Sequence, residues 1–503
     1  MVATSLFVEL LRTRPHLLFW LMAAIQAVLW TLVPTLFFAA PPGNLPVVLA
    51  IGHEFQLGTE YGPPLAFWLA EIAFRLGGMF GVYLLSQICI VVCYWAVLAL
   101  GRAIVGEVHA VIGVLLMAGI AVFSLPTPAF GPGILAAPLW ALMLLHYWQA
   151  TQRDEWVYWL ALGLEAGLLL LTTYAGIILI GLLLAYSASS PSGRAQYGTV
   201  GPWIAGILVI AVLFPYLVWF ELSGGSDLPD FATVITNVRR WGQITIALVI
   251  GHIGLAILVV LARGMFFRSD ATPPAVSRPK VAPSARRFVY FFALVPMLSM
   301  ILFALLTRRP ENFIGTPLVV LSGLAVVIAS GDRIKIEHQY LIGSVWAALL
   351  ALPPLLVALV IVIQPWVWPL DLQVGRPAAA MGQFFADSFQ RRTGRPLAIV
   401  AGDLPAASLV ALAAPSRPSL YLASAAEFLP RLNRRDLDEK GAVILWPATD
   451  TAGRPPPEIA RQFPDLVAEV PQGFPRRFEG RMAQTRVGWG MIRPRATGAP
   501  QAQ

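Results

Sequence analysis

Long apolar runs constrain this chain more than any other feature. A helix needs about 20 apolar residues to cross the hydrocarbon core of a bilayer. The run at residues 157–187 is longer than one span and is interrupted at residues 172–176, so it predicts two short helices. The sequence therefore predicts a polytopic α-helical membrane protein with about 11 transmembrane helices and with its termini on opposite sides. The runs lie at residues 17–39, 77–101, 108–126, 134–150, 157–187, 201–220, 243–262, 288–307, 312–330 and 341–364.

The composition excludes several other classes of protein. With 57% hydrophobic and 12% charged residues, the chain is too apolar for an ordinary soluble domain. The net charge of +8 does not indicate nucleic-acid binding, because the basic residues are dispersed among short loops and a C-terminal region instead of forming one stripe. Cys89 and Cys93 lie four residues apart in one apolar run. We therefore expect them to be buried core residues and not a disulfide or a metal pair.

The distribution of arginine and lysine predicts the orientation in the membrane. Cytoplasmic loops are enriched in these residues, and the excess is found on the side of the N-terminus. We therefore expect a cytoplasmic N-terminus, an uncleaved first span that acts as a signal anchor, and an outward C-terminal region. Only five basic residues before the last span fall on the outer side, and they are Arg75, Arg239, Arg240, Arg308 and Arg309.

The first outer loop, residues 40–76, contains the most informative polar segment. Between His53 and Leu65 it carries a histidine, the carboxylates of Glu54 and Glu60, and a rigid Pro63-Pro64 turn. Charged groups beside hydrocarbon are costly, so a cluster of them next to two spans predicts a function.

The region 365–503 has no spanning run, and its pattern predicts a small α/β domain outside the membrane. Helical patterns at 377–392 and 404–413 alternate with strand-like runs at 396–401, 420–422 and 442–446. Asp403 follows the first of these runs, where it could contact a ligand or, in the favoured reading, cap the following helix. We expect the tail beyond Pro494 to be disordered.

Polar residues inside the spans have structural alternatives. Glu165 is unusual in hydrocarbon, which makes it a functional hypothesis, although it could also bond to a neighbouring helix. Glu71 and Arg75 are four residues apart, so an ion pair on a helix surface is expected. Packing or helix-bonding roles are expected for His109, His146 and His252.

The order of these parts resembles the membrane glycosyltransferases of the GT-C fold that use polyprenyl-phosphate sugars. The nearest group is the protein O-mannosyltransferase and aminoarabinose transferase superfamily. The resemblance is carried by residues 52–58 (Gly-His-Glu-Phe-Gln-Leu-Gly) and 63–65 (Pro-Pro-Leu) in the first loop, and by residues 138–142 (Pro-Leu-Trp-Ala-Leu) in a later span. It implies a GT-C-like transmembrane domain over residues 1–364 and an extracytoplasmic domain over 365–503.

The resemblance also implies a reaction and a set of partners. A sugar would pass from a polyprenyl-phosphate carrier to an envelope acceptor at the bacterial inner membrane, with membrane lipid as a further partner and no nucleic acid. Such a transfer needs a base for the acceptor and cations for the leaving phosphate. Glu60, Glu54 and the position of Asn44 are the catalytic candidates. The candidates for binding the donor phosphate are Arg308, Arg309, His53, Tyr61 and Tyr174.

The sequence does not identify a cofactor. A divalent metal is poorly supported, because the first loop has no pair of carboxylates at the spacing of metal ligands. Several family positions have also changed. Asn44 and Val47 stand where the family has acidic residues, Gly62 replaces a histidine, and Thr173 replaces a lysine.

These departures keep a second function open. The chain could be a catalytically inactive relative that binds polyprenyl-linked lipid or that partners with an active glycosyltransferase. A secondary transporter is a weaker alternative, because the expected internal repeat is not visible in the sequence.

Overall fold

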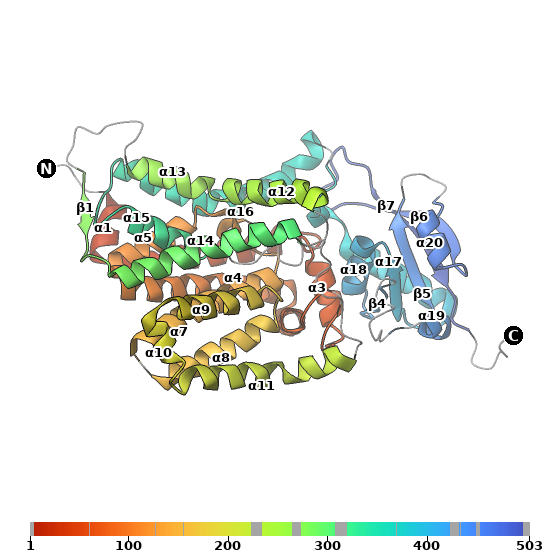
Figure 1. Ribbon diagram of the computed structural model, residues 1–503. Coiled ribbons are helices and arrows are strands. Elements are labelled where there is room, and N and C mark those ends of the chain that lie inside the picture. Colours follow the sequence, from red (N-terminus) through yellow and green to blue (C-terminus); the bar gives the residue numbers. More distant parts are fainter. Residues whose placement is uncertain are drawn as a thin grey trace.

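The computed structural model describes residues 5–59, 61–125, 127–153, 155–222, 234–263, 273–306, 319–368, 370–422, 432, 434–448 and 453–495. Helices that run side by side form a bundle, and a region of strands and short helices lies at one end of it (Figure 1). A short two-stranded sheet, β1 (Ala275–Ser277) paired with β2 (Arg333–Lys335), is placed at the opposite end. The chain is therefore mostly helical, as predicted.

Each apolar run that the structure describes contains helix. Within the described residues, six helical segments are long and apolar enough to cross a membrane, at 15–37, 65–105, 201–222, 241–262, 283–302 and 339–367. The total of about 11 spans stays a prediction. The helices of the bundle are α1 (Leu6–Thr13), α2 (Pro15–Phe37), α4 (Leu65–Val105), α5 (Glu107–Met117), α6 (Ala121–Ser124), α7 (Pro132–Arg153), α8 (Trp156–Leu170), α9 (Gly176–Ser189), α10 (Pro191–Gln196), α11 (Gly201–Leu222), α12 (Val234–Gly251), α13 (Ile253–Ala262), α14 (Pro283–Leu306), α15 (Ser322–Ala329) and α16 (Gln339–Val367).

The first outer loop is more structured than the sequence indicates. It contains α3 (Leu45–Gly52), and α4 begins at Leu65, directly after the Pro63-Pro64 turn, and not near Gly77. The backbone of Gly77 and Gly78 is not helical, and Gly78 has a φ of +57°, so α4 kinks there. Glycine permits this conformation at little steric cost. The predicted interruption at residues 172–176 is confirmed, because α8 ends at Leu170 and α9 begins at Gly176.

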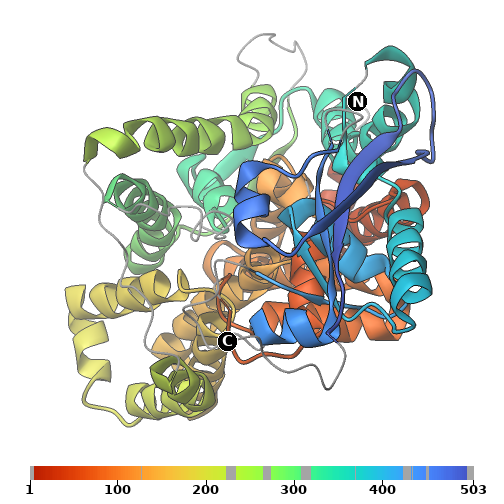
Figure 2. The same ribbon diagram turned by 90° about the vertical axis from the view of Figure 1, so that its right-hand side faces the viewer.

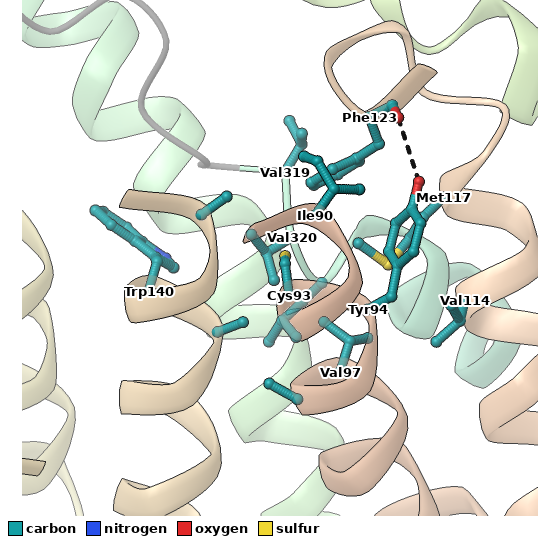
Figure 3. Packing of buried hydrophobic residues seen from close by; sticks show 14 of the residues in the cluster. Ile90, Cys93, Tyr94, Val97, Val114, Met117, Phe123, Trp140, Val319 and Val320 are labelled. Carbon is teal, nitrogen blue, oxygen red and sulfur yellow. Dashed lines mark hydrogen bonds between the residues drawn. The ribbon is translucent and has the colours of Figure 1, made fainter. Parts of the chain in front are cut away.

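The core of the bundle surrounds α4. Ile90, Cys93 and Tyr94 on α4 pack against Met117 of α5 and Trp140 of α7 (Figure 3). The Tyr94 hydroxyl lies 3.3 Å from the backbone oxygen of Phe123, a contact that satisfies this buried polar group. Cys89 and Cys93 are both buried and free, which confirms the predicted core role.

The other end of the molecule holds a five-stranded mixed sheet with the order β4-β3-β5-β7-β6. Strand β3 pairs in parallel with β4 and β5, whereas β7 runs antiparallel to β5 and β6. Its strands are β3 (Ile399–Gly402), β4 (Ser419–Leu420), β5 (Ala442–Pro447), β6 (Val467–Phe474) and β7 (Thr485–Ile492), and its helices are α17 (Ala378–Thr393), α18 (Leu404–Ala413), α19 (Arg434–Lys440) and α20 (Pro457–Gln462), preceded by a 3₁₀ turn at Gln373–Gly375.

Asp403 caps α18. Its carboxylate accepts a hydrogen bond of 3.2 Å from the backbone nitrogen of Ala406. The favoured reading of this residue is confirmed, because the bond satisfies a free donor in the first turn of the helix.

The C-terminal region is attached to the first loop. Helix α3 lies between the end of the bundle and α18 (Figure 1). Ala50 of α3 belongs to the apolar cluster of Phe385 and Val410 in the C-terminal region. The backbone oxygen of Val374 accepts hydrogen bonds from the nitrogens of Ala39 and Ala40, at 2.8 and 3.1 Å.

Seen from the C-terminal end, the sheet covers the N-terminal helices of the bundle and leaves those of residues 150–260 at the side (Figure 2). The predicted domain boundary at 364/365 and the outward location stay predictions.

Candidate functional site

A buried carboxylate, that of Glu71 on α4, lies where the first loop meets the C-terminal region. Its side chain is only 2% exposed and contacts three basic side chains. Nδ1 of His53 lies 3.0 Å and Nε of Arg75 lies 2.9 Å from Oε1, and Nη2 of Arg417 lies 2.8 Å from Oε2. We call these four residues the Glu71 cluster.

Close packing of α3 on α4 brings His53 to Glu71. Gly52 ends α3, and a Cβ atom at this position would lie 2.3 Å from the backbone oxygen of Phe67 and 3.3 Å from Cβ of Glu71. Only glycine permits this approach without a shift of the backbone. His53 follows directly and therefore lies beside Glu71, while Arg75 lies one turn further along α4.

Arg417 reaches the cluster from the loop between α18 and β4. Its side chain is 17% exposed and lies over the ring of Phe74, with 4.7 Å between the guanidinium carbon and the ring centre. Burial lowers the pKa of Arg417, and the carboxylate of Glu71 opposes this effect. Its φ is +47°, which is uncommon for a residue other than glycine. These contacts hold the residue in that conformation.

Arg75 and His53 are the accessible members of the cluster. The Arg75 side chain is 54% exposed, and its guanidinium lies 4.9 Å from the centre of the Phe55 ring. The His53 side chain is 32% exposed. Two guanidinium groups face one carboxylate, so the cluster has a net positive charge even when His53 is neutral. Such a site favours a phosphate or another anion.

The second half of the loop contacts the break between α8 and α9. The backbone nitrogen of Leu65 donates to the oxygen of Leu171 at 3.0 Å. A Cβ at Gly58 would lie 2.3 Å from the ring of Trp219, which stacks on Tyr216. The hydroxyls of Tyr216 and Tyr174 are 2.7 Å apart. The structure therefore brings Tyr174, one of the predicted phosphate ligands, to the helices that support the first loop.

The remaining predicted site residues have different surroundings. Asn44 is exposed at the start of α3 and makes no side-chain capping bond. Oε2 of Glu54 accepts a hydrogen bond of 2.8 Å from Nε2 of Gln56. Tyr61 is exposed, and its backbone nitrogen donates to Oγ1 of Thr59 at 3.2 Å. Glu60, Arg308 and Arg309 lie outside the described residues. Their proposed roles stay predictions.

The expected pair of Glu71 and Arg75 forms, but the prediction of a helix surface is wrong for Glu71. The first loop and the C-terminal region cover its carboxylate, a contact that i,i+4 spacing cannot reveal. Sequence reasoning also missed Arg417. It stands in a Ser-Arg-Pro segment that carries no motif.

The polar residues of the spans bond mainly to neighbouring helices. Nδ1 of His146 lies 2.6 Å from Oε1 of Glu165, which joins α7 to α8. Nε2 of His252 lies 3.2 Å from Oγ of Ser322, and His109 is buried. In the part of the chain that the structure describes, no three His, Cys, Asp or Glu side chains are grouped to hold a metal ion.

The chain is similar to known membrane glycosyltransferases. Residues 61–219 match the family described as Dolichyl-phosphate-mannose-protein mannosyltransferase. Among solved structures, ArnT from Cupriavidus metallidurans bound to undecaprenyl phosphate is similar, with a TM-score of 0.55 and 13% identity over 96% of this chain and 99% of that chain.

A weaker likeness is that to the apo form of the Archaeoglobus fulgidus oligosaccharyltransferase, with a TM-score of 0.44 and 14% identity over 81% of this chain and 64% of that chain. None of the curated protein sequences matches the chain. The family segment and the fold shared with ArnT confirm the resemblance predicted from the sequence, and the chain is a multi-pass membrane protein with the GT-C glycosyltransferase fold.

Proposed function

We propose that the protein transfers a sugar from a polyprenyl-phosphate carrier to an acceptor of the bacterial envelope. The fold supports this proposal, since it is shared with an ArnT structure that holds undecaprenyl phosphate. In the proposed arrangement the N-terminus lies in the cytoplasm. The first loop and the C-terminal region lie outside the inner membrane, connected by about 11 spans.

The observation that carries the proposal is the net positive charge of the Glu71 cluster, where the first loop meets the C-terminal region. Transfer breaks the bond between the sugar carbon C1 and a phosphate oxygen, so negative charge develops on the leaving phosphate. A guanidinium group stabilises such charge by paired hydrogen bonds. Arg75 uses Nε for Glu71, and its side chain is 54% exposed, so we assign its guanidinium to the phosphate. The further candidates from the sequence that remain for this role are Tyr61, Tyr174, Arg308 and Arg309, whereas one ring nitrogen of His53 is bonded to Glu71.

The acceptor must lose a proton during the reaction. Glu71 is not suited to take it, because both of its oxygens accept hydrogen bonds from basic side chains. Glu54 and Glu60 are the carboxylates proposed from the sequence for this role.

Purified protein in lipid vesicles tests the proposal. It should transfer sugar when it is given undecaprenyl-phosphate-linked hexoses or pentoses together with envelope extracts. Arg75→Gln should lower the rate by about 100-fold, as expected for the loss of one group that stabilises developing charge. Arg333→Gln changes an exposed arginine at the opposite end of the bundle and should leave the rate unchanged. The absence of transfer from every donor would contradict the proposal.

The second candidate is a non-catalytic relative that binds the carrier lipid. The observation that favours it is the exposed amide of Asn44 at the position where the family has an acid. In that case vesicles that contain undecaprenyl phosphate should show binding without turnover, and Arg75→Gln should weaken the binding.

A further inference from the structure

The imidazole of His53 has one nitrogen in use and one available. A carboxylate can only accept a hydrogen bond, so Nδ1 must donate its proton to Oε1 of Glu71 over 3.0 Å. The lone pair of the neutral ring is then on Nε2. Within the described residues, Nε2 has no hydrogen-bond partner, and the side chain is partly exposed. The fold therefore presents a basic nitrogen next to the first loop.

Glu71 is held in place and cannot turn away from His53. It is buried, Arg75 donates to Oε1, which His53 also contacts, and Arg417 donates to Oε2. A fixed carboxylate that orients an imidazole and stabilises its protonated form is the arrangement found beside the nucleophile in serine hydrolases. We propose that His53 is the general base that deprotonates the acceptor, and that Glu71 and Arg417 position it. This assignment rests on the proposed function.

The other candidates in the first half of the loop fit this role less well. Asn44 carries an amide, which does not take up a proton at neutral pH. One oxygen of the Glu54 carboxylate already accepts a hydrogen bond of 2.8 Å from Gln56. His53 alone among these three residues combines an oriented ring with an available basic atom.

The proposed step is balanced in atoms and electrons. Nε2 of His53 takes the proton of an acceptor hydroxyl while the acceptor oxygen forms a bond to C1 of the sugar. The bond from C1 to the phosphate oxygen breaks, and polyprenyl phosphate leaves with the electron pair. The products are the glycosylated acceptor, polyprenyl phosphate and protonated His53, which then returns its proton to water.

Several charged groups face the ring and influence this step. Glu71 stabilises the protonated ring, whereas Arg75 and Arg417 oppose it. Glu54 follows His53 directly in the chain. The pH dependence of the rate therefore reports on the whole cluster and must be compared between variants.

The variant His53→Asn distinguishes the roles of the two ring nitrogens. Its amide NH₂ lies near the position of Nδ1 and can still donate to Glu71, but nothing replaces Nε2. We expect kcat to fall by at least about 100-fold, the usual contribution of a general base, while KM for the carrier-linked sugar stays within about threefold. A loss of rate toward acidic pH, which we expect for the wild type once its general base is protonated, should be absent from the variant.

A matched control is His16→Asn. His16 is paired with a glutamate as His53 is, since its Nε2 lies 3.1 Å from Oε1 of Glu107, but it lies near the start of α2, far from the first loop. It should keep the wild-type rate. Nitrogen NMR of histidine-labelled wild-type protein should also find the proton of neutral His53 on Nδ1.

The outcomes distinguish the two proposals. If the wild type transfers sugar and His53→Asn keeps its kcat and its pH profile, the assignment of His53 is overturned and the proposed function stands. If the wild type transfers nothing, the proposed function fails and the base assignment fails with it. A proton found on Nε2 of neutral His53 would contradict the assignment whatever the activity.

Discussion

Nη2 of Arg417 lies 2.8 Å from Oε2 of Glu71, although 346 positions separate the two residues in the sequence. One residue belongs to the C-terminal region and the other to the first turns of α4. Their contact makes the C-terminal region part of the candidate site, because it fixes the carboxylate that also holds His53 and Arg75. The C-terminal region therefore does more than cover the end of the bundle.

The substitution Arg417→Leu should destabilise the protein by about 3 kcal/mol. It removes one partner of a buried ion pair and leaves Glu71 less compensated, and such changes cost about 3–5 kcal/mol. The free energy of unfolding in detergent, measured with urea, tests this value. Lys440→Leu is the control, because Lys440 pairs with Asp436 on an exposed helix, where such pairs contribute about 0.3–0.5 kcal/mol. Equal losses in the two variants would contradict the buried pair.

A second prediction concerns the contact between Gly58 and Trp219. The variant Gly58→Ala adds a methyl group that would lie 2.3 Å from the Trp219 ring, so the ring must move. Overpacking of this kind costs about 1–3 kcal/mol, and the melting temperature should fall accordingly. In a background with Trp219→Leu, Gly58→Ala should cost much less, since the obstructing ring is gone.

The control for this prediction is Gly181→Ala on α9. A Cβ at Gly181 would meet no atom within 4 Å. In a helix, alanine is more favourable than glycine by about 0.5–1 kcal/mol. The control should therefore keep or raise the melting temperature. A loss equal to that of Gly58→Ala would show that the contact with Trp219 is not the cause.

Local patterns predicted much of the fold. The apolar runs placed the helices of the bundle, and the Thr-Thr-Tyr-Ala-Gly interruption at residues 172–176 placed the break between α8 and α9. The position of Asp403 after an apolar run indicated a helix cap, which the bond to Ala406 confirms. These features depend on neighbouring residues only, so the sequence alone contains them.

The candidate site was less predictable, because its contacts join distant segments. His53 stood out in the polar loop, but nothing in the sequence connects it to Glu71 or to Arg417. The spacing of Glu71 and Arg75 correctly predicted that they form an ion pair. It wrongly predicted that Glu71 lies on an exposed helix surface. Burial at a junction depends on what packs above the helix, and here that is α3 and the loop of Arg417.

A third prediction concerns Gly62, the position at which the resemblance drawn from the sequence implies a histidine. Gly62 has a φ of +125°, a backbone conformation that residues other than glycine rarely adopt. The variant Gly62→His should therefore lose about 1–3 kcal/mol of stability from backbone strain. Gly62→Ala is the control and should lose as much, because the cause is the backbone and not the imidazole. A stable Gly62→His beside a destabilised Gly62→Ala would contradict this reason.

The companion change Asn44→Asp should be tolerated. Asn44 is exposed at the N-terminus of α3, where a negative charge is favourable by about 0.3–1 kcal/mol. Restoring the acid at this position alone is therefore the cleaner test of a lost reaction. If the inactive-relative hypothesis holds, Asn44→Asp should raise transfer above the wild-type level, measured with carrier-linked sugar in vesicles.

The last prediction concerns acid stability at the start of the C-terminal region. Asp371 accepts hydrogen bonds of 2.7 Å from Nη2 of Arg376 and 2.6 Å from Nη2 of Arg476. Burial raises the pKa of Asp371, but the two arginines outweigh it and lower the pKa overall. A lowered pKa in the folded state contributes stability above the ordinary pKa of about 3.9, and this contribution is lost as the pH falls through the folded-state value.

Asp371→Asn should therefore lower the melting temperature at pH 7, and the difference from the wild type should shrink as the pH falls from about 4 to about 2. Arg476→Gln should reduce the same pH dependence, because it removes one of the two arginines that lower the pKa of Asp371. Scanning calorimetry in detergent measures both effects. The carboxylate of Asp371 remains partly exposed, so at pH 7 Asp371→Asn should destabilise the protein less than Arg417→Leu does. A difference that grew toward acidic pH would show that the pKa of Asp371 is raised and that burial prevails over the arginines.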